Sequence, residues 1–335
     1  GAGTDLIAAG TARDGYGTVD TLVEINNIRG SAFADLIYGS DSTTGSEYFE
    51  GTAGADTIHG GGGIDYLRYE NSPGAVTVNL AVDGSGVVAN DGFGTADTFT
   101  GIEGVMGSRF GDVLTGSDRT DTTERFQGMA GNDTITGGLG TDRVEYGRSD
   151  TGVNVNLATG TASDGFGTTD ALSGIEQVTG SAFNDTITGD ANANRLDGGV
   201  GNDAISGGGD NDTLIGAAGD DILVGGIGAD IFDWNGGHQG TAALPATDTI
   251  SDFDLVINSD KLDLKDILVG DTPGTLGNYL HFSFDGANTT IEVKSQGALG
   301  DVDQEIVLVG VNLTSIGNDS DIISNLISNG KLITD

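Results

Sequence analysis

The stretch from residue 180 to residue 233 decides the fold, because it repeats one nine-residue pattern six times without a break: GSAFNDTIT, GDANANRLD, GGVGNDAIS, GGGDNDTLI, GAAGDDILV and GGIGADIFD. Glycine stands at position 1 and often at position 4, aspartate at position 6 and an apolar residue at position 8. Self-similarity at a short fixed period is typical of solenoids, in which each repeat buries its apolar face against its neighbours. The stretch therefore predicts a repetitive, turn-rich fold.

Further copies lie upstream in a larger repeat of 77 residues. GSAFADLIY at 30 and GSRFGDVLT at 107 are each followed by a 12-residue insert, at 39–50 or 116–127, and then by two nonapeptides, at 51–68 or 128–145. Between these blocks, VTVNL and VNVNL alternate with the period of two expected of half-buried strands. We therefore expect repeat units at 1–68, 69–145 and 146–233, and a separate module at 234–335, where the glycine repeats stop.

The spacing within the nonapeptide suits a hard cation. Glycines at positions 1 and 4 permit left-handed backbone conformations, so that six residues can form a tight loop with carbonyl oxygens pointing inward. The last three residues then form a short strand whose position-8 side chain points into the core. Position 6 ends the loop, where stacked loops bring carboxylates and carbonyls to one point. Such an all-oxygen shell, without nearby His or Cys, favours calcium over zinc or copper.

The tandem nonapeptides resemble the RTX repeat, the calcium-binding β-roll of bacterial type I secreted proteins. The resemblance implies an all-β, right-handed parallel β-roll in repeated blocks with interspersed β segments, followed by a small mixed β/α C-terminal module. Several Ca²⁺ ions would lie between loops two repeats apart on each side of the roll. The implied ligands are the position-6 aspartates and position-4 glycines: Asp35, Asp56, Asp65, Asp112, Asp133, Asp142, Asp185, Asp203, Asp212, Asp221, Asp230, Gly54, Gly63, Gly131, Gly140, Gly201, Gly219 and Gly228.

Some repeats depart from the pattern. Phe33, Phe110 and Phe183 replace the position-4 glycine, and Asn194 replaces one carboxylate. We therefore expect the repeats at 30, 107, 180 and 189 to be capping or hydrophobic coils that hold fewer ions.

A second motif, DG-aromatic-GTxD, recurs between the blocks and resembles loops found between RTX blocks in large secreted proteins. It places two acidic side chains on a glycine turn, and we expect calcium ligation by Asp14 with Asp20, Asp91 with Asp97, and Asp164 with Asp170. Solvated turn residues are the alternative. Glu103 and Glu176 are possible further ligands, and Glu47 and Glu124 in the inserts are weaker candidates.

The tail, from GGIGADIFDW at 225 through DTISDF and DKLDLKDIL to NLISNGKLITD, is similar to the C-terminal target domain of large RTX adhesins. The resemblance implies an uncleaved export signal read by a type I ABC transporter, and a protein secreted to the bacterial cell surface as a biofilm or cell adhesin. Asp248 and Asp252 are either calcium ligands or surface charges. The spacing of Ile322, Ile323, Leu326 and Ile327 predicts a short helix that stops near Gly330.

Composition excludes several classes of protein. Thirteen basic and 51 acidic residues give a net charge of −38, which repels nucleic acid and anionic membranes and calls for cations. The absence of cysteine excludes disulfides and thiolate zinc sites. No apolar run is long enough to span a bilayer.

Three other functions are alternatives to a calcium-triggered folding unit. No HExxH or GxSxG motif is present, so we expect no enzyme. A carbohydrate- or cell-surface-binding module is the alternative function, with the inserts and the aromatic side chains of Tyr48, Tyr69, Tyr146 and Trp234 as places to look. Ice binding would need a continuous threonine row, which position 3 of the repeats lacks.

Overall fold

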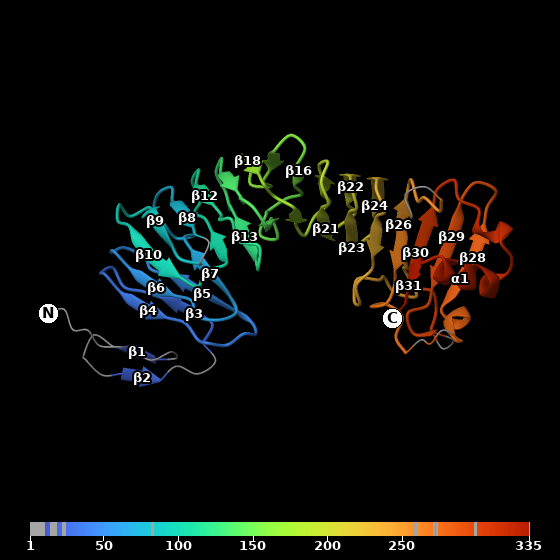
Figure 1. The fold of residues 1–335 in the computed structure, drawn as a ribbon, viewed down its shortest axis with the longest axis horizontal. Coiled ribbons are helices and arrows are strands. Elements are labelled where there is room, and N and C mark those ends of the chain that lie inside the picture. The colour runs from blue at the N-terminus through green and yellow to red at the C-terminus, as the bar shows by residue number, and fades with distance from the viewer. Residues whose placement is uncertain are drawn as a thin grey trace. The chain divides into compact units, whose positions relative to one another are not determined.

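Short strands joined by glycine-rich loops make up most of the structure (Figure 1). The computed structural model describes residues 25–81, 84–256, 260–270, 272, 274–297 and 300–334, and the backbone of 11–13 and 19–21. The chain forms two compact units: the first contains residues 1–145 and 166–175, and the second contains residues 146–165 and 176–335.

The first unit is a roll with two sheets. One sheet is wholly parallel and contains, in spatial order, β3 (Asn27–Arg29), β5 (Ser46–Glu50), β7 (Ile64–Arg68), β11 (Gly104–Met106), β13 (Thr123–Gln127) and β15 (Thr141–Glu145). The other contains β4 (Leu36–Tyr38), β6 (Thr57–His59), β10 (Asp97–Thr100), β9 (Gly86–Asn90), β8 (Thr77–Leu80), β12 (Val113–Thr115), β14 (Thr134–Thr136) and β18 (Thr169–Ser173), and only β9 runs against its neighbours. A separate antiparallel pair is formed by β1 (Thr11–Arg13) and β2 (Val19–Thr21).

The second unit repeats this plan. Its first sheet is parallel and contains β19 (Gln177–Thr179), β21 (Arg195–Val200), β23 (Thr213–Ala218), β25 (Ile231–Asp233), β27 (Lys261–Asp263) and β31 (Leu332–Ile333). Its second sheet contains β17 (Thr161–Ser163), β16 (Asn154–Asn156), β20 (Thr186–Thr188), β22 (Ala204–Gly209), β24 (Ile222–Ile227), β26 (Ala246–Ile250), β30 (Gln304–Leu308), β29 (Thr289–Val293) and β28 (Leu280–Phe284). The pairs β16–β17, β29–β30 and β28–β29 are antiparallel.

The pairing register confirms the solenoid. In the tandem repeats, Leu196 pairs with Leu214 and Ile205 pairs with Leu223, so each coil contains two nonapeptides. All twelve position-8 side chains are buried: Ile37, Ile58, Leu67, Leu114, Ile135, Val144, Ile187, Leu196, Ile205, Leu214, Leu223 and Phe232. The predicted fold class is therefore confirmed, because alternate nonapeptides supply parallel strands to the two sheets, which face each other across this apolar core.

The C-terminal module contains the 3-10 helices η1 (Leu276–Asn278) and η3 (Leu313–Ser315) and the helix α1 (Asp319–Ser328) beside β28–β30 (Figure 1). Asn318 and Asp321 form a capping box at the start of α1, which satisfies its first N–H groups. The predicted helix is confirmed, with Ile322, Ile323 and Leu326 buried, but Ile327 is 38 % exposed. Within the described part of the chain, no helix has the length and apolar character needed to cross a membrane.

Candidate calcium-binding site

The position-6 side chains lie at the ends of the loops, two residues before the inward-facing strand residue. Asp203, Asp212, Asp221 and Asp230 are at most 2 % exposed although each can carry a charge. The other position-6 residues buried in this way are Asp56, Asp65, Asp112, Asp133, Asp142, Asp185 and Asn194, whereas Asp35 is half-buried. Burying a carboxylate without a compensating partner is costly, so each of these oxygens needs a hydrogen-bond donor or a cation.

In the tandem repeats of the second unit, the backbone of the neighbouring coil holds one oxygen of the position-6 carboxylate. In the second unit, the Asp185 N–H donates to Oδ1 of Asp203 (N···O 2.8 Å), and the Asp203 N–H donates to Oδ1 of Asp221 (2.8 Å). On the opposite side of the roll, the Asp212 N–H donates to Oδ1 of Asp230 (2.9 Å). The position-6 side chains therefore form two hydrogen-bonded ladders along the roll, one beside each sheet.

The second oxygen has no such partner in the glycine loops. Among the described residues, the buried Oδ2 atoms of Asp56, Asp65, Asp203, Asp212, Asp221 and Asp230 accept no hydrogen bond. Each Oδ2 faces the position-1 glycine of its own loop: a Cβ placed on Gly198 would lie 2.2 Å from Oδ2 of Asp203, and one on Gly216 would lie 2.2 Å from Oδ2 of Asp221. A buried carboxylate oxygen left open in this way fits coordination to a cation.

The prediction that the position-1 glycine is needed for a left-handed backbone is wrong. Gly198 and Gly216 are outside the left-handed region, and they are required because a side chain there would collide with the carboxylate. At position 4 the predicted positive φ is found in Gly201 and Gly219, at 138° and 141°.

Backbone carbonyls complete an all-oxygen donor set. A Cβ placed on Gly219 would lie 1.9 Å from the carbonyl oxygen of Gly201, and one on Gly228 would lie 1.9 Å from that of Asp210, so successive loops stack main chain on main chain. Among the described residues, no three acidic or histidine side chains gather around one point, and an ion held here would draw most of its ligands from carbonyls. Carbonyl and carboxylate oxygens are the ligands that Ca²⁺ takes, and soft thiolate or imidazole ligands are not in these loops.

The site is electrostatically unfavourable without a cation. Burial, assisted by neighbouring carboxylates, raises the pKa of Asp65, Asp203 and Asp212 to about 7 from 3.8. The same causes raise the pKa of Asp221 and Asp230. The folded roll therefore stabilises either a proton or a cation on these groups near neutral pH.

Glutamates at wider turns occupy the same ladder positions in the first unit. Glu47 pairs in register with Asp65, and Glu124 pairs with Asp142. Glu103 accepts a hydrogen bond from the Asp65 N–H at Oε2 (3.2 Å). These glutamates are weaker candidates than the aspartates by sequence, but they share one feature of the sequence. Each lies two residues before a buried apolar strand residue, as Glu47 does before Phe49.

The DG-aromatic-GTxD residues have separate roles. Asp14 lies outside the described residues, and only the backbone of Asp20 is described, in β2. Asp91 holds its own turn, accepting from the N–H groups of Phe93 (2.8 Å) and Thr95 (2.9 Å). Asp97 continues the ladder by accepting from the Asp56 N–H (2.9 Å).

The third copy of this motif is equally buried. Asp164 is fully buried, and Asp170 accepts at Oδ1 from the Asp133 N–H (3.2 Å), as Asp97 does from the Asp56 N–H.

The ladder ends at Asp248 in the second unit. Its Oδ1 accepts from the Asp221 N–H (3.0 Å), and its Oδ2 accepts from Trp234 Nε1 (2.6 Å) and Gln304 Nε2 (3.0 Å). Asp252 accepts from the N–H groups of Gly225 and Gly226 (2.9 and 2.8 Å). Protein N–H groups thus hold both oxygens of each carboxylate.

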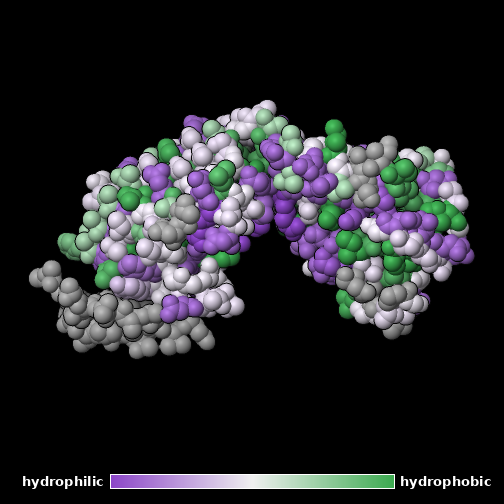
Figure 2. All heavy atoms as spheres, viewed as in Figure 1, coloured by the Kyte–Doolittle hydropathy of each residue, from purple (hydrophilic) through white to green (hydrophobic). Residues whose placement is uncertain are grey.

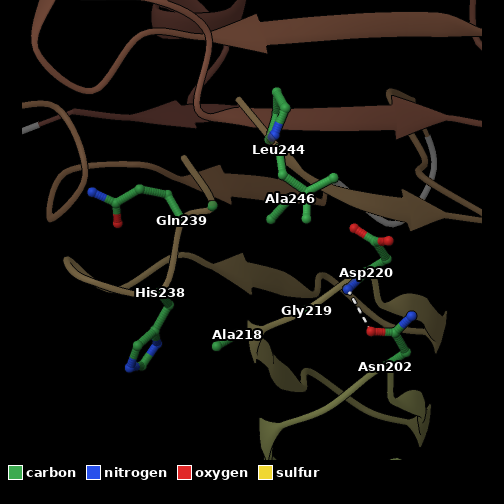
Figure 3. A pocket seen from close by; sticks show the side chains of 10 residues that line it. Asn202, Ala218, Gly219, Asp220, His238, Gln239, Leu244 and Ala246 are labelled. Carbon is green, nitrogen blue, oxygen red and sulfur yellow. Dashed lines mark hydrogen bonds between the residues drawn. The ribbon is translucent and has the colours of Figure 1, made fainter. Parts of the chain in front are cut away.

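Position 5 carries polar contacts that the sequence analysis missed. The Asp220 N–H donates to Oδ1 of Asn202 (3.1 Å), and the Thr247 N–H donates to Oδ1 of Asp220 (2.8 Å). These two side chains, with His238 and Gln239, line a cavity of about 260 Å³, and Leu244, Pro245 and Ala246 form its apolar part (Figure 3).

The aromatic candidates for ligand contact lie mostly in the core. Tyr69, Tyr146 and Trp234 are at most 5 % exposed. Tyr48 is half-buried and stacks on Tyr66 with ring centroids 5.1 Å apart. On the face seen in Figure 2, exposed apolar residues occur in small groups among polar ones.

The nonapeptides match a known family of calcium-binding repeats. The family model for the RTX calcium-binding nonapeptide repeat matches residues 24–43, 41–71, 118–150, 170–205 and 198–232. The AlgE6R3 subunit of a mannuronan C5-epimerase from Azotobacter vinelandii is 30 % identical, over 38 % of this chain and 71 % of that subunit, with a TM-score of 0.31. The AlgE6R2 subunit of the epimerase is 27 % identical, over 47 % of this chain and 92 % of that subunit, with a TM-score of 0.34.

A more distant structure is the extracellular lipase LipA from Serratia marcescens, which is 14 % identical over 94 % of this chain and 41 % of the lipase, with a TM-score of 0.20. No curated protein matches the chain.

Proposed function

Because this chain belongs to the family of RTX calcium-binding nonapeptide repeats, we propose that it is a folding unit whose two rolls form when several calcium ions bind. The observation that carries the proposal is the ladder of buried carboxylates whose Oδ2 atoms have no protein partner, as in Asp203, Asp212, Asp221 and Asp230. The ions would be held by these oxygens and by the carbonyls of stacked loops. Calcium supplies the positive charge that the ladder lacks, so its binding energy becomes folding energy.

Calcium binding is tested by equilibrium dialysis of the whole chain against calcium, with magnesium as the control. We expect several calcium ions per chain and much weaker uptake of magnesium, which requires a small octahedral shell and keeps its waters. A chain that takes up no calcium at millimolar concentration would exclude the proposed function.

We further propose that the chain is the calcium-dependent region of a type I secreted surface protein, an adhesin by its resemblance, which is exported unfolded and folds outside the cell. The net charge of −38 supports this proposal, because the ladder is unfavourable where calcium is scarce. Export is tested by co-expressing the chain with a type I transporter and comparing it with a chain that lacks residues 319–335. We expect the full chain in the medium and the truncated chain in the cell; equal export of both would place the signal elsewhere.

A second candidate function, calcium-dependent recognition of a sugar or cell surface, is favoured by the cavity beside position 5. Asn202 and Asp220 line this cavity and also belong to the calcium loops, so ion binding would order them. A glycan array probed in millimolar calcium and again in chelator tests this function, with His238→Ala as the variant that alters the cavity without touching the ladder. Calcium-dependent binding that the variant loses would support recognition.

A further inference from the structure

In some loops the serine at position 2 donates hydrogen bonds to the acidic side chain of the same loop. We call these loops closed, and we call the loops without such bonds open. In the repeat at 180, the Ser181 N–H donates to Oδ2 of Asp185 (N···O 2.5 Å), and the Ser181 hydroxyl donates to Oδ1 of Asp185 (2.7 Å). The hydroxyl also accepts from the N–H of Phe183 (3.1 Å), which fixes its orientation. Because the Val153 N–H donates to Oδ1 as well (2.7 Å), both carboxylate oxygens are occupied by protein donors.

The first unit contains the same arrangement. In the repeat at 107, the Ser108 N–H donates to Oδ2 of Asp112 (2.5 Å), and its hydroxyl donates to Oδ1 (2.7 Å). Ser31 makes the same contacts with Asp35. In the inserts, the N–H groups of two further serines donate to glutamates in the same way: Ser40 to Glu47 and Ser117 to Glu124, both at 2.7 Å.

The glycine loops differ at position 2. There the residue is left-handed, with φ of 97° at Gly199 and 109° at Gly208, and even Ala217 has φ of 72°. Ser181 and Ser108 are not left-handed. The backbone conformation at position 2 therefore distinguishes the two kinds of loop. Where φ is negative, the N–H points at the carboxylate, as at Ser181. Where φ is positive, Oδ2 of the carboxylate has no partner, as in Asp203.

The two kinds of loop follow a fixed order. Within each block, the first two loops carry serine at position 2, or Asp190 in the repeat at 189, and the following loops are left-handed there. In that repeat, the Asp190 N–H donates to Oδ1 of Asn194 (2.7 Å), so the loop closes around an amide. Each block therefore begins with a closed coil and continues with open ones.

We infer that the serine-closed loops bind no calcium and form the ion-independent first coil of each block, on which the ion-binding coils stack. This inference rests on the proposed calcium function and assigns the ions to the glycine loops. In a closed loop, the donors that approach the carboxylate supply the positive charge that an ion supplies in an open one. A cation at Asp185 would have to compete with the Ser181 N–H and hydroxyl for the carboxylate, whereas Oδ2 of Asp203 has no protein donor.

The test compares two aspartates that lie one coil apart in the same ladder. Asp185→Asn changes a closed loop and Asp203→Asn changes an open one; an asparagine Oδ1 can still accept the ladder hydrogen bond in both. The number of calcium ions bound per chain is measured by native mass spectrometry of the full chain. We expect Asp203→Asn to lose at least one ion and Asp185→Asn to keep the wild-type number.

Loss of an ion from Asp185→Asn, to the same extent as from Asp203→Asn, would overturn the inference while leaving calcium binding intact. A wild-type chain that binds no calcium would instead exclude the proposed function. If Asp185→Asn does not fold in calcium, Ser181→Ala provides the second variant, because it removes only the hydroxyl. We expect Ser181→Ala to keep every ion and to have a lower denaturation midpoint; loss of an ion there also overturns the inference.

Discussion

The glycine at position 1 is required for space rather than for backbone freedom. At Gly216 a Cβ would lie 2.2 Å from Oδ2 of Asp221, the oxygen that would bind the ion. At Gly209, in position 3, the nearest atom to a Cβ is 3.6 Å away, which is ordinary contact. Glycines that look alike in the sequence therefore have different tolerances.

Gly216→Ala should therefore lower the free energy of unfolding in calcium by roughly 1–3 kcal/mol, because the methyl group forces the carboxylate away from its ion. Gly209→Ala, the matched control, should change it by no more than about 0.5 kcal/mol. Urea denaturation in calcium measures both values. Equal effects of the two substitutions would exclude a special role for the position-1 space.

In the absence of calcium, protons bound to the buried carboxylates should partly stabilise the fold. Burial raises the pKa of Asp203 to about 7 from 3.8, so the folded ion-free chain binds more protons than the unfolded chain between these values. Its stability should therefore rise as pH falls from about 7 toward 4 and be least above pH 7. Circular dichroism of calcium-depleted protein at pH 5 and at pH 8 measures this effect; more β structure at pH 8 would contradict the assigned shifts.

At the scale of the elements, the ladder beside β22, β24 and β26 ends in a closed polar cluster. Asp248 accepts three hydrogen bonds, from the Asp221 N–H, Trp234 Nε1 and Gln304 Nε2. This cluster connects the last calcium coil to β30 of the C-terminal module, because Gln304 begins β30. Folding of the roll and of the module should therefore be coupled.

Asp248→Asn should lower the free energy of unfolding by about 1–3 kcal/mol, because the new amide donor faces the donors of Trp234 and Gln304. Asp210→Asn is the matched control, since Asp210 is exposed and its φ of 65° suits asparagine. Thermal denaturation followed by tryptophan fluorescence reports on the cluster directly. An unchanged midpoint for Asp248→Asn would show that the cluster does not couple the two parts.

Much of the fold is predictable from the nonapeptide because its period sets both the coil length and the buried residue. Position 8 is buried in every repeat, Ile37 and Phe232 included. The roles of Glu47 and Glu103 are less visible, because the wider turns shift the spacing from glycine to acid. The serine closure at Ser181 is also hidden, because it depends on the direction of a backbone N–H.

At the scale of the whole molecule, ordinary salt should not replace calcium. The net charge of −38 is partly exposed, and salt screens exposed charges. Buried oxygens such as Oδ2 of Asp212 are shielded from the solvent and require a ligand in direct contact. In chelator at pH 8, raising sodium chloride to about 1 M should therefore leave the rolls unfolded. Full β structure in salt alone, measured by circular dichroism, would assign the calcium effect to screening.

At pH 8, where protons do not replace the ion, the carboxylate ladders should fold only around calcium. Far-ultraviolet circular dichroism of the whole chain at pH 8, first in chelator and then with calcium added back to millimolar concentration, tests it most directly. We predict a largely unfolded spectrum in chelator and a strong β spectrum on addition of calcium, reversible on chelation. A full β spectrum in chelator at pH 8 would contradict the account.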